Sequence, residues 1–350
     1  MGSILQATPM LLAIREKYPE AKIIFVSTKS NLAILQKIKV IDQIVVVDDS
    51  GFLKFVGSNI SALFTLIRIR PQIYFDLEIY SDYSTLFTLF TLSVNRVGFY
   101  LRSSSFRMGI YTHMMLFNSR APISKVYLQA SKLIGCSDKN DNLYPFLKED
   151  LGEPIINQKY IVVNPNASDL RLERRWDAKN YIHLIQKILD KNKDIIVALI
   201  GSKGEAPYSE KIAIEVKSER CVNYAGKTNI DGLINLIANA EMMISNDTGP
   251  MHIAFCTNTP IIALFGPCSP EQYGVSNQVY TIYKPVYCSP CVHDFETPPC
   301  KGKNVCMQII EMNEVFHLFE EVMYQNKKPR NPVDTFIYSS KGGILGEIGR

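Results

Sequence analysis

The chain has little of what marks secreted, membrane-spanning or nucleic-acid-binding proteins. Its 38 basic residues nearly balance 34 acidic ones, and a net charge of only +4 excludes the strongly basic surface of a nucleic-acid binder. No uninterrupted apolar run reaches the roughly 20 residues of a membrane span, because Ala62 to Phe75 contains Arg68, Arg70 and Pro71. The first residues do not show the pattern of a secretory leader, and Gln6 stands where N-myristoylation needs Ser or Thr. We therefore expect a cytoplasmic protein without structural disulfides or a nucleic-acid partner.

What the chain has is enough apolar sequence for two cores, with 47% hydrophobic residues among 350. Helical patterns alternate with short β-branched runs such as "AKIIFVS" (residues 21–27), and this alternation predicts parallel sheets covered by helices. We predict an α/β fold with a first domain over 1–153 and a second over 154–325. The Pro-, Gly- and charge-rich residues 326–350 are predicted to form a poorly ordered tail.

The stretch "SNDTGPMHIAF" (residues 245–255) predicts the end of a strand, a tight loop and the start of a helix. Thr248 or Gly249 would cap this helix, whose N-terminal amides can bind a phosphate. Asp247 would accept hydrogen bonds from sugar hydroxyls or fix the loop, and His252 would lie on the ligand side of the first turn. An ordinary helix cap beside a surface histidine explains the isolated stretch equally well.

The longer segment "ISNDTGPMHIAFCTNTPIIALFGPCSPEQYG" resembles the signature of the ADP-heptose:lipopolysaccharide heptosyltransferase family, glycosyltransferase family 9. The resemblance covers most of residues 1–325. It implies a GT-B fold of two Rossmann-like doubly wound domains facing a cleft, with the acceptor on the first domain and a nucleoside-diphosphate sugar, ADP-heptose, held mainly by the second. It also implies inverting transfer of heptose to a lipopolysaccharide core or similar glycolipid, with no cofactor required.

Three arginines follow the strand-like "YIVVN" in "NPNASDLRLERRW", where guanidinium groups could clamp a diphosphate. The resemblance favours Arg174 among them, while a solvated charge run before a helix is the alternative. We expect Trp176 to pack in the domain rather than to stack on a base. The donor contacts predicted from these segments are Ser168, Arg174, Gly201, Lys227, Asp247, Thr248, Gly249 and His252.

The catalytic base departs from the family pattern. The resemblance implies a Gly-Asp pair at the start of the first helix, whereas this chain has Gly2 and Ser3 there, and a serine hydroxyl is a poor base. Asp76 and Glu78, in "YFDLEIYSD", are candidate substitutes. The competing hypothesis is a catalytically silent nucleotide-sugar or glycan-binding protein. The family's strand before this helix also has no counterpart, and a misassigned start at Met1 would explain this.

Four late cysteines, Cys288, Cys291, Cys300 and Cys306, have the spacing C-x2-C-x8-C-x5-C, which is compatible with a structural zinc site. Reduced cysteines that pack a loop are the favoured interpretation, because the intervals match no standard zinc ribbon and transfer in the family needs no metal.

A basic and aromatic stretch in the first domain, "NRVGFYLRSSSFRMGIY", suits an anionic glycolipid at a bilayer surface through Arg96, Arg102 and Arg107. A loop beside an ordinary strand explains the stretch at least as well. We therefore retain peripheral contact with the inner face of the cytoplasmic membrane as a hypothesis. A nucleotide-sugar epimerase ranks last, because no G-x-G-x-x-G fingerprint opens either half.

Overall fold

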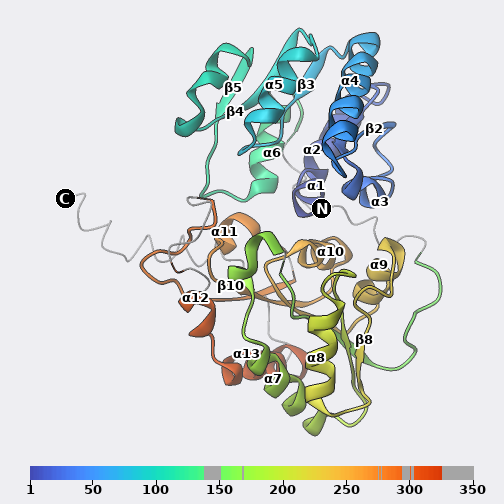
Figure 1. Ribbon diagram of the computed structural model, residues 1–350, viewed down its shortest axis with the longest axis vertical. Helices are drawn as coiled ribbons and strands as arrows, with labels where there is room; N and C mark the ends of the chain where they lie inside the picture. Colours follow the sequence, from blue (N-terminus) through green and yellow to red (C-terminus); the bar gives the residue numbers. More distant parts are fainter. Residues whose placement is uncertain are drawn as a thin grey trace. The chain divides into compact units, whose positions relative to one another are not determined.

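The computed structural model describes residues 1–137, 151–167, 169–274, 276, 278–293, 300 and 303–324. The chain divides into two units: unit 1 comprises Met1 and Ser3–Asn142, and unit 2 comprises Leu143–Arg350 together with Gly2. In both units helices cover parallel sheets, as Figure 1 shows. The tail predicted over 326–350 lies outside the described residues.

Unit 1 alternates helices with five short strands. Its strands are β1 (Ile24–Thr28), β2 (Gln43–Val47), β3 (Ile73–Phe75), β4 (Asn95–Tyr100) and β5 (His113–Leu116). Its α-helices are α1 (Gly2–Gln6), α2 (Thr8–Lys17), α3 (Leu32–Leu35), α4 (Phe52–Ile69), α5 (Asp82–Phe90) and α6 (Ile123–Lys132). Two 3-10 segments, η1 (Lys29–Asn31) and η2 (Arg102–Gly109), complete the unit.

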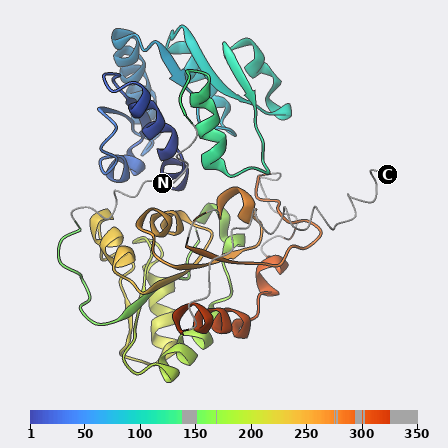
Figure 2. The ribbon, with the colours of Figure 1, turned by 180° about the vertical axis from the view of Figure 1, so that it is seen from behind.

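The strands of unit 1 form two separate parallel sheets, β1-β2 and β3-β4-β5. Helices α2 and α6 lie side by side in both views, in Figures 1 and 2. Helix α4 packs against β2. Val45 and Val47 of the strand and Leu66 of the helix belong to one buried cluster. The strand predicted within residues 21–27 is confirmed as β1.

Unit 2 has one continuous sheet of six strands. The strands are β6 (Tyr160–Asn164), β7 (Ile196–Leu199), β8 (Cys221–Asn223), β9 (Met242–Asn246), β10 (Ile261–Phe265) and β11 (Val279–Tyr283), in the order β11-β10-β9-β6-β7-β8. The helices are α7 (Ala178–Lys191), α8 (Ala206–Val216), α9 (Ile230–Ala238), α10 (Gly249–Thr257), α11 (Pro270–Tyr273), α12 (Val305–Gln308) and α13 (Met312–Tyr324), with η4 (Asp169–Arg174) after β6.

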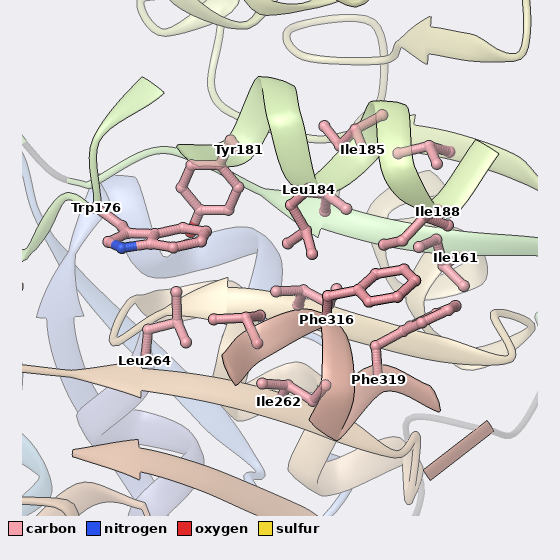
Figure 3. Close-up of a cluster of buried hydrophobic side chains, with 14 of the residues drawn as sticks. Ile161, Trp176, Tyr181, Leu184, Ile185, Ile188, Ile262, Leu264, Phe316 and Phe319 are labelled. Carbon is pink, nitrogen blue, oxygen red and sulfur yellow. The ribbon is translucent and has the colours of Figure 1, made fainter. Parts of the chain in front are cut away.

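The core of unit 2 forms where α7 and α13 cover one face of this sheet (Figure 3). Leu184 and Ile188 of α7 meet strand residues such as Ile161, and Phe319 of α13 is fully buried in the same cluster. Every residue of β6, β9 and β10 is buried, as expected for central parallel strands covered on both faces. This rigid sheet fixes the positions of the loops that follow its strands.

Helix α4 corrects one sequence expectation. The search for a membrane span counted the apolar run from Ala62, but the helix begins at Phe52 and runs for 18 residues. By length and composition alone, it is the one described helix that could cross a membrane, which is weak evidence for a span. An apolar run counted from Ala62 does not reveal the full length of α4, because Lys54 and several small polar residues interrupt the apolar positions of the helix before Ala62.

Candidate functional site

The site in unit 2 is built where β6 and β9 end side by side. The strands are parallel neighbours, with Asn164 opposite Ser245, so their carboxyl ends and the loops that follow meet at one edge of the sheet. Asn164 Nδ2 donates to Thr248 Oγ1 at 2.8 Å and to Ser245 Oγ at 3.3 Å. The two strand ends are therefore joined by side-chain hydrogen bonds as well as by the backbone ladder.

Asn246, the last residue of β9, organises the loops around the site. Its amide nitrogen donates to Pro165 O at 3.2 Å and to Asn166 O at 3.0 Å. Its Oδ1 accepts from Trp176 N at 3.2 Å and from Tyr181 Oη at 2.9 Å. Because Asn246 is fully buried, these four bonds satisfy it and fix the loop after β6. The sequence analysis missed this residue, although a polar residue ending an apolar strand was a usable signal.

Helix α10 begins directly after β9, as predicted. Thr248 occupies the N-cap position with an extended backbone, and Pro250 lies in the first turn, where its missing N–H costs nothing. The Thr248 hydroxyl makes no capping hydrogen bond; it accepts from Asn164 instead. The first-turn amides of a helix have no intrahelical acceptor, and their dipoles attract anions. Gly249 has no Cβ, so an anion could approach the backbone closely there.

Arg174 and Asp247 face each other at this edge. Arg174 Nη1 lies 3.3 Å from Asp247 Oδ2 and 3.5 Å from Asp247 O. Burial acts to lower the pKa of Arg174, but Asp247 and weaker neighbours, including Cys268, together raise it. The guanidinium stays charged and neutralises a carboxylate that would otherwise repel a phosphate at the start of α10. The structure thus brings Arg174, Asp247, Thr248 and Gly249 together.

The other two arginines of the run have structural partners. Arg175 donates to Ala167 O at 3.3 Å and lies 4.1 Å from the centroid of the Tyr208 ring, whereas Arg171 pairs with Glu173 at 3.5 Å. Trp176 is fully buried and donates its indole N–H to Ile310 O at 3.0 Å. It therefore packs in the domain and cannot stack on a base, as expected from the sequence.

Gly201 and Lys227 follow β7 and β8 at the same edge of the sheet. Gly226 N donates to Gly201 O at 2.9 Å, which ties the two loops together. A Cβ on Gly201 would lie 2.5 Å from Asn166 Nδ2, so glycine is required there for packing. Lys227 is exposed in the turn closed by its amide to Tyr224 O.

His252 lies in the first turn of α10, with its ring edge-on to Phe255. Burial lowers the pKa of His252 to about 4, against the opposing effect of Asp247. The imidazole is therefore neutral at physiological pH and contributes no positive charge to the site. Ser168, the remaining predicted contact, lies outside the described residues.

The candidate bases of unit 1 differ in their surroundings. Asp76 is buried and accepts hydrogen bonds from Tyr111 Oη at 2.6 Å, from Thr88 Oγ1 at 3.3 Å and from Glu78 N at 3.0 Å. Glu78 is less buried than Asp76. Its pKa is raised mainly by burial and secondly by the nearby charge of Asp76. Ser3 is exposed in α1 and hydrogen-bonds the Tyr127 phenol. Asp76 is thus held in a structural network that Glu78 lacks.

The four late cysteines are all unpaired, with Cys291 and Cys306 buried and Cys288 and Cys300 partly exposed. Burial, and then the three neighbouring cysteines, raise the pKa of Cys291 to about 11. Among the described residues, no group of three or more His, Cys, Asp or Glu side chains is placed to hold a metal ion. Reduced thiols packing a loop fit this arrangement, and the zinc site stays a prediction.

The basic patch predicted in the first domain does not form around Arg107. This side chain is fully buried and donates to Phe99 O at 3.3 Å and to Ser81 O at 3.1 Å. Arg96 holds Ile110 O and Ser93 O, and the Arg102 side chain lies outside the description. Arg96 and Arg107 therefore stabilise the fold, because their hydrogen bonds to backbone carbonyls hold the residues around β4 and β5 in place.

Comparison with known proteins identifies the family. The model of glycosyltransferase family 9 (heptosyltransferase) matches residues 60–301, which include every element of the unit 2 site. The chain belongs to glycosyltransferase family 9. Lipooligosaccharide heptosyltransferase 2 of Haemophilus influenzae is 41% identical over 153 residues, which are 43% of this chain and 42% of that protein. Lipopolysaccharide heptosyltransferase 3 of Escherichia coli is 24% identical over 76% of this chain and 80% of its own length.

The fold of this family 9 member resembles solved heptosyltransferases. The E. coli heptosyltransferase WaaC with ADP-2-deoxy-2-fluoro heptose gives a TM-score of 0.71 at 15% identity, covering 92% of this chain and 96% of that one. The likeness confirms the predicted GT-B fold class. The match to the H. influenzae relative spans less than half of either chain, so the substrate and partners of this chain are left to be argued.

Proposed function

We propose that the chain transfers heptose from a nucleoside-diphosphate donor, ADP-heptose, to a lipopolysaccharide core or similar glycolipid. The observation that carries the proposal is the Arg174–Asp247 pair at the N-terminus of α10, within the matched family region. Relatives named as lipooligosaccharide and lipopolysaccharide heptosyltransferases support the reaction, and the WaaC structure with ADP-2-deoxy-2-fluoro heptose supports the donor class.

In this proposal the donor diphosphate lies at the start of α10. The amides of the first turn and the Arg174 guanidinium would hold its oxygens, and Gly249 allows the close approach. Ser168, Gly201 and Lys227 are proposed to contact the nucleotide from neighbouring loops. The neutral His252 can donate a single hydrogen bond without adding charge. No metal is needed to hold the leaving diphosphate when helix amides and an arginine supply the positive field.

Glu78 is our preferred general base. The acceptor hydroxyl loses its proton to the carboxylate as its oxygen attacks the anomeric carbon, and the bond to the diphosphate breaks on the opposite face, giving inversion. A pKa raised by burial and by Asp76 makes Glu78 a stronger base than an ordinary glutamate. Asp76 is a weaker candidate because Tyr111 and Thr88 already bind its carboxylate. Ser3 would need an activating partner to serve.

Peripheral contact with the membrane is assigned to α4. Phe52, Val56, Ile60 and Phe64 recur every four residues on one helical face, and all four are exposed. Lys54 and Arg68 are exposed on the same helix and would favour anionic headgroups. A glycolipid acceptor is embedded in a bilayer, so a transferase that lies on the cytoplasmic surface of that membrane could reach it.

The alternative is a silent protein that keeps the donor pocket but has lost its base. Calorimetry with ADP-heptose and an assay of ADP release with a heptose-accepting glycolipid separate the two. We expect donor binding together with ADP release that depends on the acceptor. Binding without release would establish the silent protein, and absence of binding to the folded chain would overturn both hypotheses.

A further inference from the structure

Residues 169–176, here called the arginine loop, carry Arg174 to the edge of the donor site along an irregular backbone. Helix η4 is a 3-10 helix, and its backbone leaves the helical region at Arg171, with φ −144° and ψ 54°. Hydrogen bonds in 3-10 turns have poorer geometry than those of an α-helix, and the last carbonyls of a helix have no donor within it. The carbonyls around Arg174 therefore need donors from elsewhere in the chain.

Asn304 supplies these donors. Its Nδ2 donates to Glu173 O at 3.2 Å and to Arg175 O at 2.8 Å, so one amide group holds the carbonyls on both sides of Arg174. Asn304 is buried, and its Oδ1 accepts from Gln308 Nε2 at 3.2 Å. Removing the buried amide would leave both carbonyls without this donor, which costs more than the bonds themselves contribute.

The backbone of Asn304 adopts a conformation that few residues accept. Its φ of 23° and ψ of 53° lie on the left-handed side of the backbone map. Asn enters the left-handed region more readily than other residues except glycine. Asn304 is also the N-cap of α12, where an Asn side chain ordinarily accepts from the amides of its own helix, yet it makes no capping hydrogen bond. Its side chain therefore serves the arginine loop instead of its own helix.

Helix α12, which follows Asn304, is anchored to the sheet that carries the donor site. A Cβ on Gly266, just after β10, would lie 2.6 Å from Met307 Sδ and 3.0 Å from Cys306 Sγ, so α12 packs directly on the end of that strand. Farther along, Ile310 O accepts the indole N–H of Trp176 at 3.0 Å. Trp176 lies in the buried core of unit 2 (Figure 3). The segment from α12 onward thus holds the arginine loop against a fixed part of the unit.

The side chain of Arg174 depends on this backbone support. Its Nε is buried and makes no hydrogen bond among the described residues. Its Nη1 has only long contacts, 3.3 Å to Asp247 Oδ2 and 3.5 Å to Asp247 O. Because these contacts orient the guanidinium weakly, the position of the backbone decides where it points. A displacement of about 1 Å is enough to lose a hydrogen bond to a bound phosphate.

We infer that Asn304 is a positioning residue for donor binding: its amide fixes the backbone on both sides of Arg174, so that the guanidinium meets the donor diphosphate. The inference rests on the proposed binding of a nucleoside diphosphate at the start of α10. Asn304 lies after residues 60–301, which match the family model, so the inference extends the site beyond that region. Asn304 acts through Arg174 and has no contact of its own with the donor.

Asn304→Gly removes the amide but keeps the backbone conformation, because glycine adopts a positive φ without strain. We expect this variant to bind ADP about 10-fold more weakly in calorimetry while remaining folded by circular dichroism. Asn304→Asp has nearly the same size but cannot donate, so it should lose at least as much affinity. Lys217→Gly is the matched control, since Lys217 is exposed at the end of α8 and also has a positive φ, of 57°. It should bind ADP as the unchanged chain does.

A double-mutant cycle with Arg174→Ala distinguishes positioning from general loosening of unit 2. If Asn304 acts through Arg174, the loss caused by Asn304→Gly should shrink to less than about twofold once Arg174 is already alanine. Gln308→Ala removes only the hydrogen bond to Asn304 Oδ1 and leaves both donations to the arginine loop. This variant should keep the ADP affinity of the unchanged chain.

The inference is overturned if Asn304→Gly causes the same loss with and without Arg174, or if the folded Asn304 variants keep full affinity for ADP. Failure of both variants to fold would make Asn304 a residue of the core alone and would also overturn it. A folded, unchanged chain that does not bind ADP is a different result. It would overturn the proposed donor site, and Asn304 would then have no donor to position.

Discussion

Arg174 and Asp247 give the donor site its charge balance. A carboxylate beside the N-terminus of α10 would weaken binding of a diphosphate, but Arg174 lies 3.3 Å from it and remains charged. The pair can therefore present guanidinium donors to a phosphate. The Oδ2 of Asp247 is buried and makes no hydrogen bond of good geometry among the described residues.

Arg174→Ala should weaken binding of ADP about 10- to 100-fold, because a charge-assisted contact to the diphosphate is lost. Calorimetry with ADP measures this directly. Arg171→Ala is the matched control, since Arg171 belongs to the same run but pairs with Glu173. Equal losses in the two variants would mean that the run acts only as a diffuse positive patch.

Glu78→Gln should lower kcat by about 100-fold or more with little change in KM, because it removes only the proton acceptor. Burial raises the pKa of Glu78, so the rate of the unchanged enzyme should fall as the pH drops through that raised value and the carboxylate becomes protonated. Initial rates across pH test both points. Ser3→Ala should keep its activity; the opposite ranking of the two variants would assign the base to Ser3.

The junction of β9 and α10 depends on Asn246. Asn246→Ala leaves the buried Tyr181 hydroxyl and the Trp176 amide without this acceptor, so the free energy of unfolding should fall by about 2 to 4 kcal/mol. Urea denaturation measures the change. Asn239→Ala is the control, because the side chain of Asn239 donates a local hydrogen bond to Asn235 O, one turn earlier in α9. A loss below about 0.5 kcal/mol would show that the loops are held by other contacts.

Helix α4 should determine membrane contact. Ile60→Glu combined with Phe64→Glu should reduce binding to vesicles that contain anionic lipid by about tenfold or more, since two exposed apolar side chains no longer insert. Sedimentation with vesicles measures the bound fraction. Ile214→Glu, at an exposed apolar position of α8 in unit 2, should bind as the unchanged chain does. Undiminished binding of the double variant would remove α4 from the interface.

The sequence predicted elements best where pattern and burial agree. Strands β6 and β9 are apolar runs, and both were located, as was the start of α10. Strand β4 was not, because Arg96 within it indicated a surface patch while the structure uses its guanidinium for backbone carbonyls. Thr248 was expected to cap α10 with its hydroxyl, but Asn164 from another strand binds that group. Such cross-strand partners cannot be read from local sequence.

The two units depend on their sheets in different ways. Unit 2 has six contiguous strands that hold the donor loops, whereas unit 1 divides its strands between sheets of two and three. Sheets this small are marginal alone, so unit 1 should be the less stable of the two units.

The most direct test of the central claim is a crystal structure of the chain with ADP-heptose. The account predicts the diphosphate at the start of α10, with the Gly249 region amides and Arg174 within hydrogen-bond distance of its oxygens. A diphosphate bound elsewhere, with Arg174 still paired only to Asp247 and α10 untouched, would contradict it.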